Sequence, residues 1–201
     1  RSLSKLYTRY VSFIGIPAAF MIASLALPLT ALFGDEYIAS SIPAAIISIS
    51  IGLTTFSSIY NSQLFVKGET RWIMISNIAG LMSFIIVASI SQMLNNNITV
   101  IDLAIGRAVM VIITAGLISY KAFKFGDMKY DKKAITNSLV SSIIMASVLF
   151  MLYNLVFNSL ELITSLIILI PLGIIMYMFI LRQLHTFNKQ DSEFIIKIIY
   201  K

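Results

Sequence analysis

The sequence predicts an all-α fold, a polytopic bundle of transmembrane helices, and three observations lead to this prediction. Hydrophobic residues make up 58% of the 201 positions. Charged residues make up only 12%, about half the share of a typical soluble domain. The chain also contains several uncharged runs of about 20 residues, the length at which a helix crosses the hydrocarbon core of a bilayer. These runs are too long and too continuous for the alternating strands of a membrane β-barrel.

Short polar connections separate the apolar runs, and each run is expected to form one membrane-spanning helix. Connections of this length favour antiparallel packing of helices that follow one another in the chain. The six expected spans cover residues 11–33, 41–66, 72–94, 99–120, 135–157 and 162–181.

The first three spans differ in where proline and small residues fall. The first is uncharged but contains Pro17 and Pro28, and proline inside a helix produces a kink. The second has Pro43 in its first turn, where the missing N–H costs little. The third contains Ser76 and Gly80 one turn apart, a spacing that lets a neighbouring helix approach closely.

The last three spans are less uniform in their polar content. The fourth, TVIDLAIGRAVMVIITAGLISY, contains two charged residues, Asp102 and Arg107. The fifth is uncharged. The sixth contains Pro171 followed by Gly173 and is otherwise apolar, so we expect it to face lipid.

The basic residues predict the orientation of the chain in the membrane. The sequence has 15 Lys and Arg residues, and all except Arg107 lie before the first span, after the sixth, or in the second and fourth connections. These segments share one side of the membrane, and cytoplasmic loops carry the excess of Lys and Arg. We therefore expect a multi-pass protein of the cell (plasma) membrane with both ends of this chain in the cytoplasm. The hairpin FGDEY (33–37), which is acidic, would lie outside.

Both ends of the chain have an amphipathic pattern. Residues 1–10 form a lead-in segment in which Lys5 and Arg9 share one helical face. Residues 182–201 form a tail in which apolar and charged residues also fall on opposite helical faces. Each is expected to form a short helix on the inner surface of the membrane. One interpretation is a structural lead-in to a helix, and the other is binding of anionic membrane lipids.

Arg107 is the one basic residue inside a span. It lies about eight residues from the outer end of its span, or about 12 Å at 1.5 Å per residue, which is near the middle of a core about 30 Å thick. An arginine at this depth costs about 2.5–3.5 kcal/mol on insertion scales, and an intramembrane charge is a functional-site hypothesis by default. A structural ion pair is the alternative, but Asp102 is about 140° away around the helix. We favour a position facing a hydrated, substrate-binding cavity.

Three amide side chains are further candidates for substrate binding. Asn61 and Gln63 lie near the cytoplasmic end of the second span, and Asn77 lies about six residues into the third from the same side. They are expected to cluster in the inner third of the membrane. Hydrogen bonding between helices explains them equally well.

The sequence shows no pattern typical of catalysis. It has no cysteine and a single histidine, His185, which falls outside the spans. No metal-ligand spacing occurs, and no two carboxylates share a helical face within a span. We expect neither an enzyme nor a metal or other cofactor. The net charge of +6 is explained by membrane topology, so nucleic acid is not an expected partner.

Several short motifs occur in an order that resembles a known family. The lead-in runs into YVSFIGIPAAF, and LFGDEY, LFVKGETRW, ISNIAG, IDLAIGRAVMVIITAGLISY and the tail KQDSEFIIKI follow. This order, which covers essentially the whole chain, resembles the polysaccharide-biosynthesis flippases, O-antigen type transporters related to the multidrug and toxin extrusion carriers. Such proteins have about 12–14 spans in two bundles. The resemblance maps this chain onto the last six spans, with the N-terminal bundle of the parent missing.

The resemblance implies a transporter that flips a lipid-linked oligosaccharide by alternating access, with the missing bundle as a necessary partner. Arg107 would then suit a pyrophosphate, because a guanidinium binds phosphate oxygens in a bidentate manner. One alternative is a cation-coupled drug antiporter of the same superfamily, which needs an acidic residue deep in the membrane. Others are a membrane-embedded glycosyl- or acyltransferase subunit, which needs catalytic carboxylates or histidine, and a non-transporting scaffold subunit.

Overall fold

The computed structural model describes residues 3–124, 131–156 and 161–184, and within these ranges it consists of helices and their connections, without a strand. In these ranges, seven α-helices and one 3₁₀ helix follow one another. Their bounds are α1 Leu3–Ser24, α2 Ala26–Ala31, η1 Asp35–Ser40, α3 Ser41–Val66, α4 Thr70–Asn95, α5 Val100–Lys124, α6 Lys132–Leu155 and α7 Leu162–Gln183.

Five segments within the described residues are long and apolar enough to cross a membrane, in agreement with a helical membrane bundle. They are Asp35–Thr55, Thr70–Leu94, Val100–Lys124, Lys132–Leu155 and Leu162–Gln183. The remaining expected span, 11–33, is divided between α1 and α2, and its apolar helical part is the shorter segment Thr8–Ser24. The count of six spans therefore stays a prediction.

Proline explains the division of the first span. Pro28 has no N–H to donate to the carbonyl of Ser24, four residues earlier, and its ring crowds that carbonyl. The chain leaves regular helix geometry at Leu25, where φ is −102° and ψ is 15°. The Ser24 hydroxyl turns back to the carbonyl of Met21 at 2.9 Å. Pro17, by contrast, lies within α1, which continues through it.

The expected terminal segments have different outcomes. α1 begins at Leu3 and continues without a break to Ser24, so the described part of the lead-in 1–10 belongs to the same helix as the start of the first span. The expected tail, 182–201, falls almost entirely outside the described residues.

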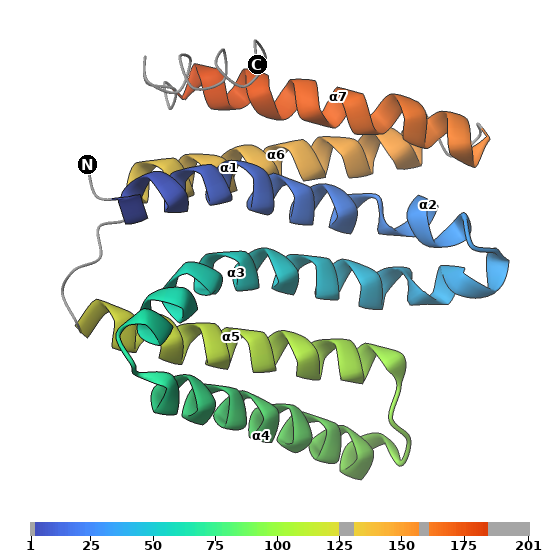
Figure 1. Cartoon of the computed structure of the whole chain (residues 1–201). Coiled ribbons are helices and arrows are strands. Elements are labelled where there is room, and N and C mark those ends of the chain that lie inside the picture. Colours follow the sequence, from blue (N-terminus) through green and yellow to red (C-terminus); the bar gives the residue numbers. More distant parts are fainter. Residues whose placement is uncertain (1–2, 125–130, 157–160, 185–201) are drawn as a thin grey trace.

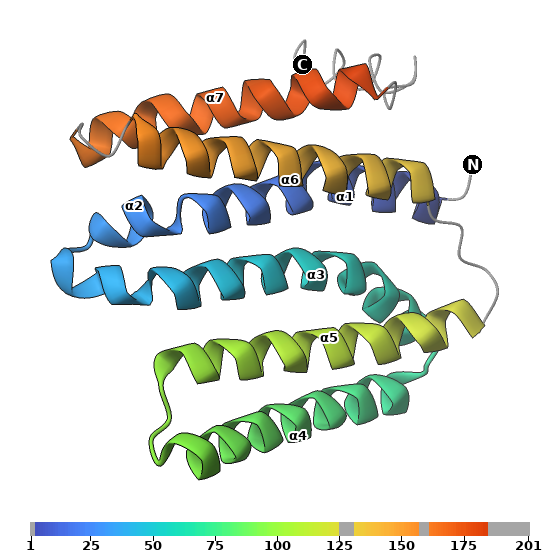
Figure 2. The same ribbon diagram turned by 180° about the vertical axis from the view of Figure 1, so that it is seen from behind.

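The long helices form a row in the order α4, α5, α3, α1, α6, α7, and the front and back views show the same sequence (Figures 1 and 2). Chain neighbours are not always packing neighbours. α3 and α4 are joined by a short connection, but α5 lies between them over most of their length. α1 packs against both α3 and α6 and so joins the two halves of the row.

Two hydrophobic clusters stabilise the two halves of the row. The larger lies between α1, α2, α6 and α7 and includes Met145, Leu149 and Leu169, which are completely buried. The smaller lies between α3, α4 and α5, where Tyr60 and Leu64 pack on Ile118 and Ala122. Where α1 crosses α3, small residues bring the helices together, because a Cβ at Gly52 would lie 2.8 Å from the Cβ of Ala19.

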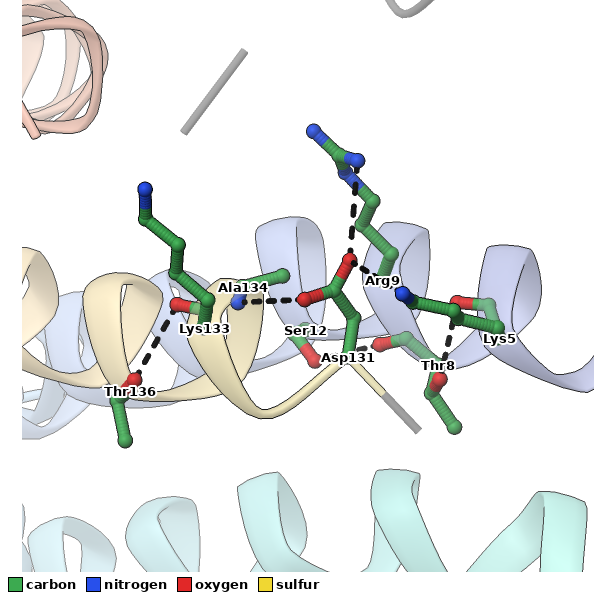
Figure 3. A network of polar contacts seen from close by, with 8 residues as sticks. All are labelled: Lys5, Thr8, Arg9, Ser12, Asp131, Lys133, Ala134 and Thr136. Carbon is green, nitrogen blue, oxygen red and sulfur yellow. Dashed lines mark hydrogen bonds and ion pairs between the residues drawn. The ribbon is translucent and has the colours of Figure 1, made fainter. Parts of the chain in front are cut away.

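A polar network joins the start of α1 to the start of α6, in the half of the row that contains the larger cluster (Figure 3). Arg9 and Lys5 on α1 both approach Asp131, at 3.8 and 4.0 Å between charged atoms. Asp131 also caps α6 by accepting a hydrogen bond from the backbone N–H of Ala134 at 3.2 Å. Farther along, the buried hydroxyl of Ser138 donates to the carbonyl of Ser12 at 2.8 Å.

The basic residues of the described helices gather where the helices end on one side of the row. This side, which we call the basic end, contains the start of α1, α4 and α6 and the end of α3, α5 and α7, at the left in Figure 1. Arg107 is the exception among the described Lys and Arg residues. The separation follows the pattern that membrane topology requires, and its assignment to the cytoplasmic side stays a prediction.

Candidate functional site

A polar cavity of about 480 Å³ lies over α5, between α3 and α4. Its volume is within the range of about 300–1,000 Å³ that is usual for small-molecule sites. Two further cavities among the described residues, on α1, α2 and α7, are lined almost entirely by apolar side chains. The polar cavity is lined by Thr54, Thr55, Ser57, Ser58, Asn61, Asn77, Arg107, Met110, Val111, Thr114, Ala115 and Ile118.

The cavity brings together three of the four residues that the sequence singled out. Arg107 on α5, Asn61 on α3 and Asn77 on α4 all line it. Gln63, two residues beyond Asn61 on α3, does not, because two residues along a helix are about 200° apart around its axis. Arg107, Asn61 and Asn77 thus meet over α5, and Gln63 is not part of this group.

Arg107 provides the positive charge of this cavity. It lies seven residues after Val100, where α5 begins, or about 11 Å along the helix axis. Its side chain is exposed, and Nη1 lies 3.3 Å from the sulfur of Met110, one turn toward the basic end. No carboxylate among the described residues forms an ion pair with it. The structural ion pair considered as an alternative is therefore absent from this part of the chain.

Asp102, the nearest acidic residue on α5, is engaged at the start of the helix. Its Oδ2 accepts hydrogen bonds from the backbone N–H of Thr99 at 2.9 Å and from the Thr99 hydroxyl at 2.6 Å. The Thr99 hydroxyl in turn faces the N–H of Asp102 at 3.3 Å. This reciprocal pair is a capping box, which satisfies backbone donors at a helix N-terminus. Asp102 thus stabilises the start of α5.

Hydroxyl groups on α3 form the wall of the cavity opposite Arg107. Each donates to a backbone carbonyl one turn earlier: Thr54 and Thr55 to Ile51 at 2.7 and 3.0 Å, Ser57 to Thr54 at 3.0 Å, and Ser58 to Thr55 at 2.8 Å. Because these protons are used within the helix, the hydroxyl oxygens are available to the cavity as acceptors.

Asn61 adds a further acceptor. Its Oδ1 is buried and has no hydrogen-bond partner within the described residues. A buried amide oxygen without a partner costs about 1–3 kcal/mol, so a ligand or water in the cavity that donates a hydrogen bond to it is favoured. Guanidinium donors on α5 and hydroxyl and amide acceptors on α3 therefore face the same space.

Sequence reasoning missed part of the lining. Thr54, Ser57 and Ser58 belong to the stretch TTFSS (54–58), whose concentration of hydroxyls in an apolar span is a visible signal. Thr114 is harder to find, because its hydroxyl also contacts the Ser76 carbonyl of α4 at 3.4 Å. Its place in the cavity depends on how α4 and α5 pack.

No family model, curated protein or solved structure matches this chain.

Proposed function

We propose that this chain is the C-terminal part of a membrane transporter that flips a lipid-linked oligosaccharide across the cell membrane by alternating access. The observation that supports this proposal best is the cavity that joins Arg107, Asn61 and Asn77 within helices apolar enough to cross a membrane. It has one cation and many hydrogen-bonding groups, which suits a substrate that is anionic and rich in hydroxyls.

The proposed role of Arg107 is to bind the pyrophosphate that links lipid and sugar. A guanidinium presents its donors in a planar fork that matches two phosphate oxygens. Charge-assisted hydrogen bonds of this kind are about twice as strong as neutral ones. An arginine without a carboxylate partner in the described helices gains this stabilisation only when an anion or water enters the cavity.

The proposed role of the α3 wall is to contact sugar hydroxyls. The oxygens of Thr54, Ser57 and Ser58 already use their protons within α3, and Asn61 Oδ1 lacks a partner. Sugar hydroxyls supply the donors that such acceptors require. Gln63, also expected to bind substrate, lies outside this wall and has no role in the proposal.

The alternative functions receive less support from the described residues. A cation-coupled antiporter needs a carboxylate available deep in the membrane, and Asp102 is engaged in capping α5. A glycosyl- or acyltransferase subunit needs grouped catalytic side chains. Groups of three or more His, Cys, Asp and Glu residues are not found in the part of the chain that the structure describes.

The test is transport by the transporter that contains this chain, reconstituted in liposomes with a fluorescent lipid-linked oligosaccharide. Replacing Arg107→Gln should reduce transport per inserted molecule by about 10–150-fold, which corresponds to losing hydrogen bonds to a charged group worth about 1.5–3 kcal/mol. Arg107→Lys should restore part of the activity, since an ammonium keeps the charge but lacks the fork.

The matched control is Arg71→Gln, which removes an exposed arginine at the basic end of α4 and should leave transport unchanged. Wild-type transport by a correctly inserted Arg107→Gln protein would contradict the proposed role of this residue in the site.

A further inference from the structure

A long apolar groove runs between α1 and α7, on the other half of the row from the polar cavity. Its volume is about 470 Å³. Pro17, Leu25 and Tyr177 form a buried floor, and the exposed side chains of Ile14 and Ile174 form its two edges. An adjoining apolar cavity between α2 and α7 shares Leu29 and Ile170 with it, so the apolar path continues toward the end opposite the basic end.

The packing of α7 explains why the groove exists. Gly173 lets α7 approach α6, because a Cβ there would lie 2.8 Å from Leu149 Cδ1. α1 also packs along α6, whereas α1 and α7 hardly contact each other. Two helices that pack on the same neighbour but hardly contact each other leave a furrow between them, and this furrow is the groove.

Basic residues continue both walls of the groove beyond its basic end. On α7, Arg182 follows the lining residue Met178 by four positions, so both lie on the same helical face. On α1, Arg9 precedes the lining residue Phe13 by four positions, and its guanidinium lies 5.6 Å from the centre of the Phe13 ring. Lys5 is one turn farther out on the same face.

The charge at this mouth of the groove is strongly positive. Among the described residues at the basic end of α1, α6 and α7, Asp131 is the one carboxylate, and Lys5 and Arg9 already approach it. Arg182 is exposed and has no carboxylate within ion-pair distance in the described ranges. The basic side chains at this end are Lys5, Arg9, Lys132, Lys133 and Arg182.

We propose that the α1–α7 groove is a binding site for an anionic diacyl phospholipid, with one acyl chain in the groove and the headgroup phosphate at Arg182 and Lys5. The apolar floor suits a lipid acyl chain, and the basic residues beyond it suit an anionic headgroup. A zwitterionic lipid has the same acyl chains but no net charge to offset the cations. This site is separate from the Arg107 cavity, so the inference does not depend on the proposed transport function.

The experiment measures which lipid occupies the groove by fluorescence quenching. Trp72 is the single tryptophan of the chain, so a Trp72→Phe background allows one reporter to be introduced, Ile174→Trp in the groove. The matched control is Ile175→Trp, at the same depth of α7 but outside the groove lining. Each protein is reconstituted in phosphatidylcholine containing a small fraction of chain-brominated phosphatidylglycerol or chain-brominated phosphatidylcholine.

Brominated phosphatidylglycerol should quench the Ile174→Trp reporter more strongly than its fraction in the bilayer predicts, and brominated phosphatidylcholine should not. The Ile175→Trp reporter should follow the bulk fraction for both lipids. Each basic side chain near a membrane surface favours an anionic lipid by about fivefold. Arg182→Gln and Lys5→Gln should therefore each reduce the enrichment by about that factor, whereas Lys124→Gln on α5 should leave it unchanged.

A further variant tests the chain site without altering charge. Ala18 lines the groove and is exposed, so Ala18→Phe should fill the groove and reduce the enrichment at the Ile174→Trp reporter. Equal quenching of the two reporters by brominated phosphatidylglycerol would overturn the site. Equal enrichment of the two brominated lipids, or displacement of phosphatidylglycerol by a polyprenyl phosphate at trace concentration, would overturn its assignment to an anionic phospholipid.

Discussion

Asp131 has two structural roles at the residue scale, and they can be separated. It caps α6 through the Ala134 N–H, and it offsets the charge of Arg9, whose side chain is 8% exposed, and of Lys5, whose side chain is 38% exposed. The cap requires only an acceptor oxygen, which asparagine also provides. The charge interaction requires the carboxylate.

Asp131→Asn should therefore keep the cap and lose the charge interaction. Removing one partner of a buried ion pair costs about 3–5 kcal/mol, and the distances of 3.8 and 4.0 Å favour the lower end, about 3 kcal/mol. The measurement is resistance of the purified protein to unfolding by heat or by sodium dodecyl sulfate, followed by circular dichroism. Glu161→Gln, at an exposed position before α7 that forms no side-chain cap, should be nearly neutral.

The double variant Arg9→Met with Asp131→Asn distinguishes loss of charge balance from general damage. It removes the buried cation together with its partner, so it should be more stable than Asp131→Asn alone. If the losses of stability caused by the two single substitutions simply add in the double variant, the charge interaction has no part in the stability of this end of the bundle.

At the element scale, the positions of the helices could be predicted well, and their breaks less well. Apolar runs and polar connections predicted the second span at 41–66, the bounds that α3 has. Pro17 and Pro28 look alike in sequence, but only Pro28 is accompanied by a break. Proline in the interior of a helix removes one hydrogen bond in either case, and packing against neighbouring helices decides whether the helix continues.

Close packing of α4 on α5 depends on Gly80. A Cβ at this position would collide with the Thr114 hydroxyl and lie 3.1 Å from the Met110 carbonyl oxygen. Gly80→Ala should destabilise the protein by about 1–3 kcal/mol, as overpacking does elsewhere, although alanine is the better helix former. Gly116→Ala on α5 meets nothing within 4 Å and should be neutral or slightly stabilising. Both are measured by thermal unfolding, and equal stability of the two variants would contradict this account of the α4–α5 contact.

At the scale of the whole molecule, hydropathy predicts which segments are helices but not their order in space. Short connections suggested that α3 and α4 are packing neighbours, but α5 lies between them. The same arrangement decides the composition of the candidate site. Arg107, Asn61 and Asn77 were visible in the sequence as polar residues in apolar spans, whereas Thr114 lines the cavity only because of the way α5 packs. Residue types can be read from a sequence, and the distances between helices depend on side-chain fit.

The separation of charge along the row leads to a prediction for the whole molecule. The described Lys and Arg residues other than Arg107 lie at the basic end, and the acidic hairpin with Glu36 lies at the opposite end. Since cytoplasmic segments carry the excess of Lys and Arg, the basic end should face the cytoplasm.

The chain has no cysteine, so single cysteines can be introduced as labels at the exposed positions Glu36, Lys124 and Lys133. In intact cells a membrane-impermeant maleimide should label Glu36→Cys alone, and Lys124→Cys and Lys133→Cys should react only after the membrane is permeabilised. The unaltered chain should remain unlabelled in both conditions. Labelling of Lys133→Cys but not Glu36→Cys in intact cells would show the opposite orientation. Labelling of both would show that the basic end and the end with Glu36 lie on the same side of the membrane.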